Sequence, residues 1–227
     1  MSAASRSAIQ CTFARAILLA IVLGVWTPRV AKALTYSIDD GTAELGFGRS
    51  NGGPYICFNS FPITGGNNII NSISIAWSAP GASGGLNGLT YTAVLWSDPN
   101  GDGLPNDAVV LATTGGVVAN AGTNTFITSF ITPTTVLTPN FFVGFLITHG
   151  AGQFPSAVDT TDPSFSNRSF DNFGGNINNL SGSFNIDGFG NWLIRADAVP
   201  EPSTYALLGL GLVGIVFWRR RPSRDTR

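Results

Sequence analysis

Short alternating runs of apolar and polar residues constrain this chain more than any other feature. In such a run every second side chain is apolar, which is the period of a β-strand with one buried face. Within 70–77, isoleucines alternate with serines, and similar runs occupy 89–96, 124–132 and 191–198. Residues 140–148 are apolar at almost every position, as expected for a central strand covered on both faces.

Segments rich in Gly, Pro, Asn, Asp and Ser separate these runs. We predict that they are turns: 79–88, 98–107, 113–124 and 172–183. No part of 34–198 shows a helical period over ten residues or more. The pattern therefore predicts an all-β fold, an antiparallel β-sandwich over 34–198. An open-ended repeat is the competing architecture, but the sequence has no fixed-period self-similarity.

The N-terminal segment has the three parts of a secretory signal peptide. Two arginines precede an apolar run at 16–26, and the small-x-small sequence Ala31-Lys32-Ala33 follows. We therefore predict that residues 1–33 pass through the Sec translocon and are removed by signal peptidase after Ala33. The alternative, an uncleaved anchor, would need a longer apolar run.

Charge is distributed unevenly along the chain. The full sequence has a formal charge of −1, but residues 34–198 contain three basic and eleven acidic residues, a charge of −8. Such an acidic region is a poor nucleic-acid binder, so we expect no nucleic-acid partner. It is suited to staying soluble outside the cytoplasm and to holding divalent cations.

Residue types needed for catalysis are scarce in 34–198. Cys57 is the only cysteine there and His149 the only histidine, and neither has an evident catalytic companion, so we interpret Cys57 as a buried thiol and His149 as structural. Glutamate occurs once and the aspartates cluster in turns, which disfavours the paired carboxylates of glycoside hydrolysis. We assign no catalytic residue and predict that the protein is not an enzyme.

The segment 97–107 carries candidate metal ligands. Aspartate or asparagine recurs at every second position and Gly103 follows, as in the first half of a calcium loop. An EF-hand has a bidentate Glu at the position that Val109 occupies here, so the side-chain oxygens of Asn106 and Asp107 would have to complete the ligand set. The candidate Ca²⁺ ligands are Asp98, Asn100, Asp102, Asn106 and Asp107. The alternative is a solvated hairpin turn in which these side chains cap their own backbone.

A second acidic group lies near the start of 34–198. This N-terminal acidic group consists of Asp39, Asp40 and Glu44. If the first and last strands pair, it would meet Asp197 and hold a structural cation. The alternative is an exposed acidic turn.

Residues 199–227 differ in composition from the rest. A five-residue motif at 199–203, which we call the box, comes first, and an apolar stretch at 204–218 and a basic tail at 219–227 follow it. The box is Val199, Pro200, Glu201, Pro202 and Ser203, and the tail opens with Arg219, Arg220 and Arg221. Fourteen helical residues from Tyr205 to Trp218 span about 21 Å, less than the roughly 30 Å of a hydrocarbon core. We predict a transmembrane helix at 204–218, with the arginines of the basic tail on the cytoplasmic side of the membrane. A plain C-terminal anchor is the alternative.

This three-part pattern resembles the PEP-CTERM sorting domain of Gram-negative bacteria, also called an ice-binding protein C-terminal domain, over residues 199–224. The resemblance implies that exosortase, a membrane-embedded enzyme that cuts near the motif, processes the chain. It also implies a link to exopolysaccharide and biofilm production. It implies no ice binding.

Residues 34–198 also resemble jelly-roll domains of bacterial surface proteins. The similar segments are 36–44, 95–113, 141–159 and 191–197. Some of these domains bind carbohydrate or act in adhesion, and their shared motifs specify strands and turns rather than a ligand.

Together these features predict an exported, non-enzymatic structural, adhesive or carbohydrate-binding protein. It would cross the inner membrane, be anchored there transiently, and reach the cell surface or extracellular matrix, with exopolysaccharide as a partner. Tyr55, Trp77 and Trp96 are candidates for sugar binding, and each suits a core equally well. The alternatives are a polysaccharide-modifying enzyme and a plain C-terminally anchored envelope protein.

Overall fold

The computed structural model divides the chain into two units, Met1–Lys32 and Ala33–Arg227. It describes residues 33–82, 84–161, 167–186, 188–199 and 211, all in the second unit. The expected signal peptide at 1–33 therefore lies outside the described residues except for Ala33, and the expected transmembrane segment at 204–218 does so except for Gly211. No helix within the described ranges has the length and hydropathy needed to cross a membrane.

The described residues form thirteen β-strands and one short 3-10 helix, so the all-β prediction is confirmed. The first seven strands are β1 (Leu34–Tyr36), β2 (Leu45–Phe47), β3 (Gly53–Pro62), β4 (Ile69–Ile75), β5 (Thr90–Ser97), β6 (Val109–Val117) and β7 (Ile127–Thr135). The others are β8 (Asn140–His149), β9 (Ser156–Asp159), β10 (Ser169–Asn172), β11 (Phe184–Asn185), β12 (Asn191–Trp192) and β13 (Ile194–Val199), and the helix is η1 (Pro105–Asp107).

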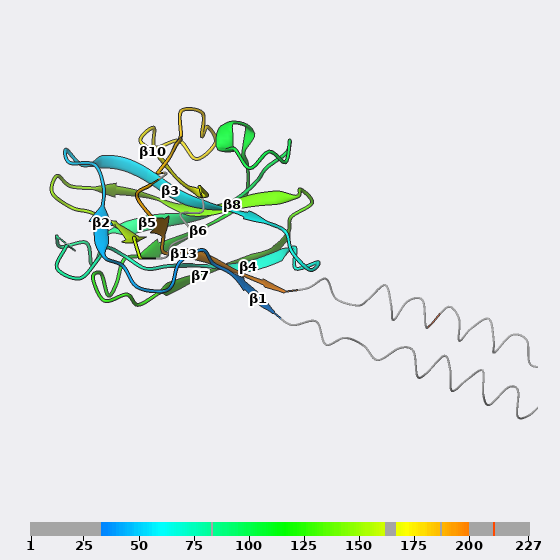
Figure 1. Ribbon diagram of the computed structural model, residues 1–227, viewed down its shortest axis with the longest axis horizontal. Coiled ribbons are helices and arrows are strands. Elements are labelled where there is room, and N and C mark those ends of the chain that lie inside the picture. The colour runs from blue at the N-terminus through cyan, green and yellow to red at the C-terminus, as the bar shows by residue number, and fades with distance from the viewer. Residues whose placement is uncertain (1–32, 83, 162–166, 187, 200–210, 212–227) are drawn as a thin grey trace, which may run out of the picture. The chain divides into compact units, whose positions relative to one another are not determined.

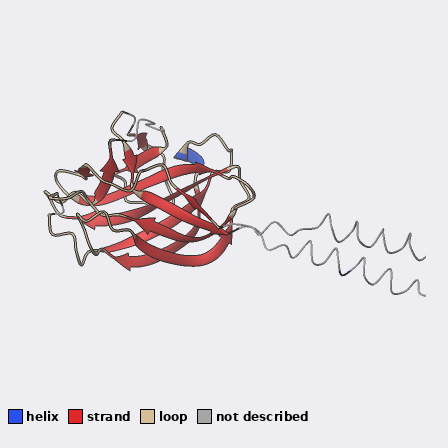
Figure 2. Cartoon of the chain, turned by 60° about the horizontal axis from the view of Figure 1, so that its bottom comes forward, coloured by secondary structure: helices blue, strands red, loops and turns tan. Residues whose placement is uncertain are grey.

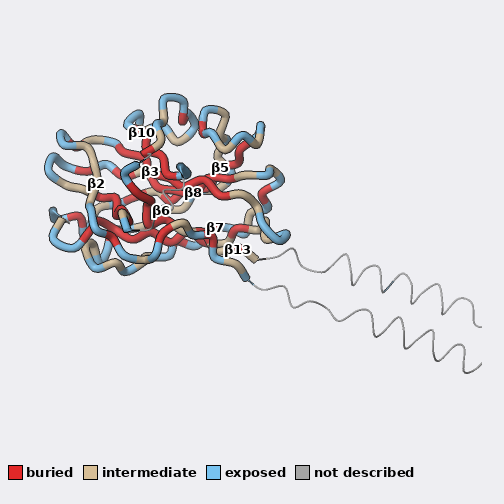
Figure 3. The backbone as a smooth tube through the Cα atoms, viewed as in Figure 1, coloured by how far each residue is buried: buried red, intermediate tan, exposed pale blue. Residues whose placement is uncertain are grey.

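Antiparallel pairing joins these strands into three sheets (Figures 1 and 2). One sheet has the order β1-β13-β4-β7, the second β11-β10-β3-β8-β5-β6, and the third β12-β9-β2. The first two sheets lie face to face, with buried residues between them (Figure 3). Their apolar faces are the inward positions of the alternating runs, so the period-2 pattern accounts for both layers.

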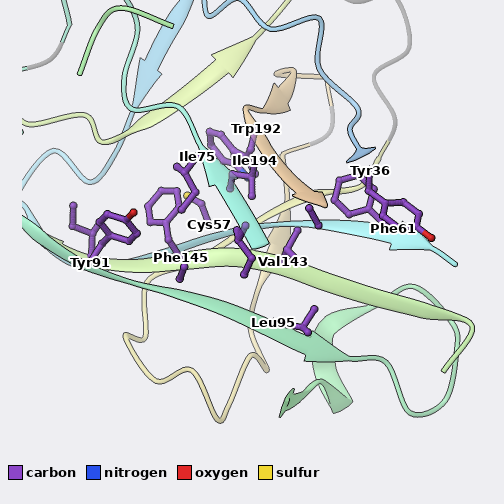
Figure 4. Close-up of a cluster of buried hydrophobic side chains, with 14 of the residues drawn as sticks. Tyr36, Cys57, Phe61, Ile75, Tyr91, Leu95, Val143, Phe145, Trp192 and Ile194 are labelled. Atoms are coloured by element: carbon purple, nitrogen blue, oxygen red, sulfur yellow. The ribbon is translucent and has the colours of Figure 1, made fainter. Parts of the chain in front are cut away.

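The core between the two large sheets is built on aromatic contacts. The ring of Trp77 lies 4.6 Å from that of Tyr91 and 4.6 Å from that of Phe145, measured between centroids. Figure 4 shows Tyr91, Phe145, Val143 and Ile75 directed into this layer. Aromatic rings bury large areas and pack edge to face, so they fill the space between two sheets efficiently.

The other face of the six-stranded sheet is also covered. Phe58 stacks on Phe170 at 5.4 Å, Phe142 joins them edge-on, and the indole N–H of Trp96 donates to the carbonyl of Ile177 at 2.8 Å. These residues form a second buried cluster. Strand β8 therefore has buried side chains on both faces, as its nearly continuous apolar sequence predicted.

Two local predictions are wrong. Strand β6 extends through residues 113–117, which the Gly and Thr content had indicated as part of a turn. The run 191–198 is not one strand, because β12 pairs with β9 while β13 pairs with β1 and β4 in another sheet. Strand β3 was not predicted at all, although it is one of the longest strands.

Candidate functional site

The aspartate loop, defined as residues 98–107, connects β5 to β6 and ends with η1. Carboxylate oxygens of Asp98, Asp102 and Asp107 lie within 4.8 Å of one another. Three of the five residues predicted as Ca²⁺ ligands are therefore brought together by the fold. Asn100 joins them, because its side-chain N–H donates to Asp102 at 3.0 Å. Asn106 is exposed on η1.

Asp98 is the structural centre of this loop. It is fully buried, and its two carboxylate oxygens accept hydrogen bonds from the backbone N–H groups of Gly101 (3.1 Å) and Gly103 (2.7 Å). The side-chain amide of Asn140, at the start of β8, also donates to Asp98 and to the carbonyl of Gly101. The aspartate loop is thus held against the first residue of β8.

One oxygen in the group has no partner. Asp107 Oδ2 accepts the backbone N–H of Asn100 at 3.0 Å, but Oδ1 is buried without a hydrogen bond among the described atoms. The one ion pair found in the described part of the chain joins Arg195 to Asp39, so no basic side chain there neutralises the aspartate loop. A buried orphan oxygen beside two further carboxylates fits a hard cation such as Ca²⁺.

The N-terminal acidic group is arranged differently from its prediction. Arg195, on β13, donates through Nε to both oxygens of Asp39, at 3.0 and 3.2 Å, and its Nη2 donates as well. Arg195 also lies over the ring of Phe126, 4.1 Å from its centroid. Burial raises the pKa of Asp39 above its usual value, and the bonds from Arg195 oppose that shift. This carboxylate is therefore engaged by a cation of the chain itself.

The other two members of the group contact the end of β9. Asp159 is fully buried and accepts the backbone N–H of Asp40 at 2.8 Å, and Glu44 accepts that of Thr160 at 2.8 Å. Hydrogen bonds from Thr42 lower the pKa of Asp40. These bonds fix the segment before β2 onto the sandwich.

The first and last strands do pair, but Asp197 does not join the acidic group. It accepts hydrogen bonds from Thr35 at 2.6 Å and Ser72 at 2.8 Å instead. Asp197 points to the same outer face of the four-stranded sheet as Arg195, but it lies two residues farther along β13, where its cross-strand neighbours are the small hydroxyl residues Thr35 and Ser72.

A row of four side chains crosses that outer face. Phe130 lies opposite Ser72, Ser72 opposite Asp197, and Asp197 opposite Thr35. Three inter-strand steps make the row about 14 Å wide. The side chain of Phe130 is 75% exposed. We call these four residues the outer-face row; it combines an exposed apolar ring with hydrogen-bonding groups.

The aromatic residues proposed for sugar binding are not on the surface. Tyr55, Trp77 and Trp96 are all fully buried, so of the two alternatives predicted for them the core position is confirmed and the sugar-binding role is wrong. Each occupies the buried face of a strand or the position just after one, which alternation alone could not distinguish from an exposed face. Phe130 was not a candidate from the sequence. It lies opposite Ser72, and a large aromatic side chain on an otherwise polar strand face is the signal that could have identified it.

Cys57 and His149 do not form a catalytic pair. The thiol of Cys57 is buried at 2.8 Å from Ser156 Oγ, and burial raises its pKa well above the usual value. His149 uses both ring nitrogens on the backbone: Nδ1 contacts the carbonyl of Gly150 at 2.9 Å, and Nε2 accepts the N–H of Arg49 at 3.3 Å. Burial lowers the pKa of His149, so the neutral ring is favoured.

Asp171 lies in the same buried region. The hydroxyl of Tyr55 donates to Asp171 Oδ2 at 3.4 Å, while Oδ1 has no hydrogen bond among the described atoms. Burial raises the pKa of Asp171 to about 7. No sequence signal marked this residue, because its burial depends on the pairing of β10 with β3.

Strand β13 leads directly into the tail. Val199, the last residue of β13, pairs with Ile69 of β4, and Pro200 follows it in the sequence. The box that was singled out in the sequence therefore begins inside a sheet, with no linker between the sandwich and Pro200.

Two solved structures resemble the fold in outline. One is a variant of the clostridial cysteine protease Cwp84 after propeptide cleavage, 11% identical, covering 74% of this chain and 40% of that one, with a TM-score of 0.49. The other contains the cysteine protease and lectin-like domains of Cwp84, a surface layer associated protein of Clostridium difficile, at 11% identity, 74% and 36% coverage, and a TM-score of 0.47. This chain thus spans less than half the length of either, and similarity at this level supports no inference about activity.

No curated protein sequence matches the chain. The PEP-CTERM protein-sorting motif does match, over residues 198–221. This range contains the whole box, the apolar stretch and the three arginines. A motif of this kind implies export, sorting to the cell surface and processing by exosortase. The chain thus carries a PEP-CTERM protein-sorting motif that begins within the last strand of an all-β domain.

Proposed function

We propose that this chain is an exported, non-enzymatic surface protein whose β-sandwich binds carbohydrate and is delivered by exosortase. The match of residues 198–221 to the sorting motif carries the delivery part of this proposal. The apolar stretch at 204–218 holds the chain in the inner membrane of a Gram-negative cell until exosortase acts. The sandwich then reaches the surface or matrix and functions with exopolysaccharide in a biofilm.

Intact-mass measurement of the mature protein tests delivery. In cells that contain exosortase, the protein should lose the mass of the apolar stretch and basic tail. In cells that lack it, those residues should remain. Retention of residues 204–227 in both strains would contradict the proposal.

The outer-face row supports carbohydrate binding. Sugars present apolar C–H faces and hydroxyl edges, so a row that has the ring of Phe130 at one end and Asp197 and Thr35 at the other offers complementary contacts along an extended chain. The row runs across four strands on the outer face of a sheet, which is suited to an extended chain rather than to a small molecule in a cleft.

A glycan-binding assay with matched variants tests this surface. Phe130→Ala should lower affinity for polysaccharide at least tenfold, because it removes the exposed ring. Phe189→Ala is the control, since Phe189 is also exposed, at 53%, and lies outside the row. Equal binding by both variants would contradict the assignment of the row.

Several observations support a role without catalysis. Cys57 is buried against Ser156, and His149 uses both nitrogens on backbone groups. Asp39 is paired with Arg195. Turnover assays on the same polysaccharides discriminate the alternatives: release of product at a rate that depends on any of these residues would favour a polysaccharide-modifying enzyme.

The aspartate loop is proposed to hold structural Ca²⁺. Asp98, Asp102 and Asp107 would supply carboxylate oxygens, and bound Ca²⁺ would compensate their charge and bring β5, β6 and β8 into a fixed arrangement. Extracellular calcium modules bind at about 10⁻⁴–10⁻³ M, so the ion should raise the melting temperature at millimolar concentration.

Calorimetric titration with CaCl₂ tests this site. The unmodified protein should release heat with one equivalent of Ca²⁺, and Asp102→Asn should abolish it. Glu44→Gln is the matched control, because Glu44 belongs to the other acidic group and should leave the titration unchanged. Absence of heat in the unmodified protein would contradict the site.

A further inference from the structure

The strand that leads to the sorting motif ends beside two loops. Val199 pairs with Ile69, and Ile69 pairs with Thr135 at the end of β7. Residues 63–68 connect β3 to β4, and residues 136–139 connect β7 to β8. Figure 1 shows the last strand, β13, ending next to β4 and β1 at this end of the sandwich. We call the two loops together the exit loops.

The exit loops are bonded to each other. The N–H of Val136 donates to the carbonyl of Asn68 at 2.8 Å, and the N–H of Ile63 donates to that of Pro139 at 2.8 Å. They line an open groove whose walls include Ile63, Val136, Leu137 and Pro139.

The surface of the exit loops is apolar and uncharged. Leu137 is 88% exposed, the most exposed of the large apolar side chains in the described residues. Neither 63–68 nor 136–139 contains a charged residue, although residues 34–198 carry a charge of −8. Leu137 and the exposed Pro139 thus present an apolar, uncharged surface at this end of an otherwise acidic domain.

The chain length to the apolar stretch limits how far the exit loops can be from a membrane. Only residues 200–203 lie between Val199 and the apolar stretch, which begins at residue 204. The five residue-to-residue steps from 199 to 204 reach at most about 17 Å when extended, and the headgroup layer on each side of a bilayer takes up about 5–7 Å of that. The end of the sandwich is therefore within about 12 Å of the headgroups while the apolar stretch is in the bilayer.

We propose that the exit loops rest on the lipid surface before sorting, with Leu137 inserted among the headgroups. This rests on the proposed anchoring of residues 204–218. The tether makes the contact intramolecular, so the high effective concentration of the exit loops at the bilayer favours even a weak apolar contact. The same contact holds Pro200–Pro202 at the membrane surface, in the plane where a membrane-embedded enzyme works.

The aspartate loop lies at the same end and sets the lipid preference. Gly101 packs against Pro139, so Asp102 and Asp107 are close to the exit loops. Without bound Ca²⁺, their charges would be repelled by anionic headgroups. Uncharged phosphatidylcholine vesicles are therefore the appropriate probe.

Lipid quenching of a site-specific dye tests the contact. The full chain with Cys11→Ser and Leu137→Cys is labelled with NBD and reconstituted into phosphatidylcholine vesicles; Cys57 is fully buried and should not react. The control carries the dye at Ala151→Cys, an exposed position in the turn after β8, at the other end of that strand from residues 136–139. Flotation reports anchoring, and doxyl-labelled lipid reports proximity to the bilayer.

The proposal predicts at least threefold stronger quenching by doxyl lipid at 137 than at 151. Flotation with equal, weak quenching at both positions would overturn the lipid contact and leave the anchor intact. Protection of the 137 dye from aqueous iodide without doxyl quenching would also overturn it, because a second copy or another protein would then cover the loop. Failure to float would overturn both the contact and the proposed anchor.

Discussion

Leu34 and Ala198 lie opposite each other in β1 and β13, so the first and last strands of the sandwich are direct neighbours. Strand β13 also pairs with β4, which makes it an interior strand whose Ile194, Ala196 and Ala198 are buried. The sandwich is therefore incomplete until the residues immediately before the sorting motif are available. Folding and presentation of the motif are coupled by this topology.

Tyr36 should be the main contributor of β1 to stability. Its ring meets Phe141 edge-on at 5.0 Å, and its hydroxyl donates to the carbonyl of Asn67 at 2.8 Å. We expect Tyr36→Phe to lower the free energy of unfolding by about 1 kcal/mol and Tyr36→Ala by about 4 kcal/mol. Urea denaturation of both variants measures this, and equal losses would show that the ring is not packed as described.

The Arg195–Asp39 pair should show strong coupling. Arg195→Met leaves the buried Asp39 carboxylate without a cation, so we expect a loss of about 2–3 kcal/mol, less than for a fully buried pair because Arg195 is 25% exposed. Asp39→Asn in the same chain should restore most of that loss. A double-mutant cycle by chemical denaturation gives the coupling energy, and strictly additive effects would contradict a direct interaction.

Asp171 should make the sandwich less stable as pH rises. Its folded-state pKa of about 7 is above the unfolded value of 3.8, so the folded state holds the proton more tightly and loses that advantage between pH 4 and 7. The shift corresponds to at most about 4 kcal/mol. We expect wild type to have a higher melting temperature at pH 5 than at pH 8 and Asp171→Asn to reduce that difference. An unchanged pH profile in the variant would contradict the assignment.

Gly144 should tolerate no side chain. It is in the middle of β8, where a Cβ would overlap the carbonyl oxygen of Cys57 and the Cβ of Phe58. We expect Gly144→Ala to cost about 3 kcal/mol or more. Gly115→Ala is the control, because the nearest atom to its Cβ would be 4.0 Å away and alanine is favoured over glycine in a strand. Similar stability of the two variants would contradict the packing of β8 against β3.

Alternation identified β4, β5 and β7, where local pattern and tertiary environment agree, but it identified neither β3 nor β6. The Gly-rich composition of 113–117 predicts a turn, yet a Cβ on Gly116 would overlap the ring of Tyr91, so glycine there serves packing between β5 and β6. Leu193 interrupts 191–198, and only the sheet arrangement shows that the two halves pair in different sheets.

The candidate sites show the same difference between what local sequence predicts and what depends on the tertiary fold. The clustering of Asp98, Asp102 and Asp107 was predictable because these residues are close in sequence and the loop folds on itself. The pairing of Asp39 with Arg195 joins residues 156 apart, and the choice between a core and a surface aromatic depends on what covers each face. Neither the ion pair nor the exposure of an aromatic ring can be predicted from the spacing of residues that are close in sequence. Phe130 is exposed because it lies on the uncovered outer face of β7, an edge strand, and the sequence of the run does not show which of its faces is covered.

Replacement of Pro200-Glu201-Pro202 by three alanines tests whether sorting depends on this motif. We expect that pulse-labelled cells accumulate the unprocessed chain in the membrane and release at least tenfold less to the surface than wild type. Alanines at residues 225–227, outside the matched range 198–221, should leave processing unchanged. Processing of the triple-alanine variant at the wild-type rate would contradict sorting through this motif.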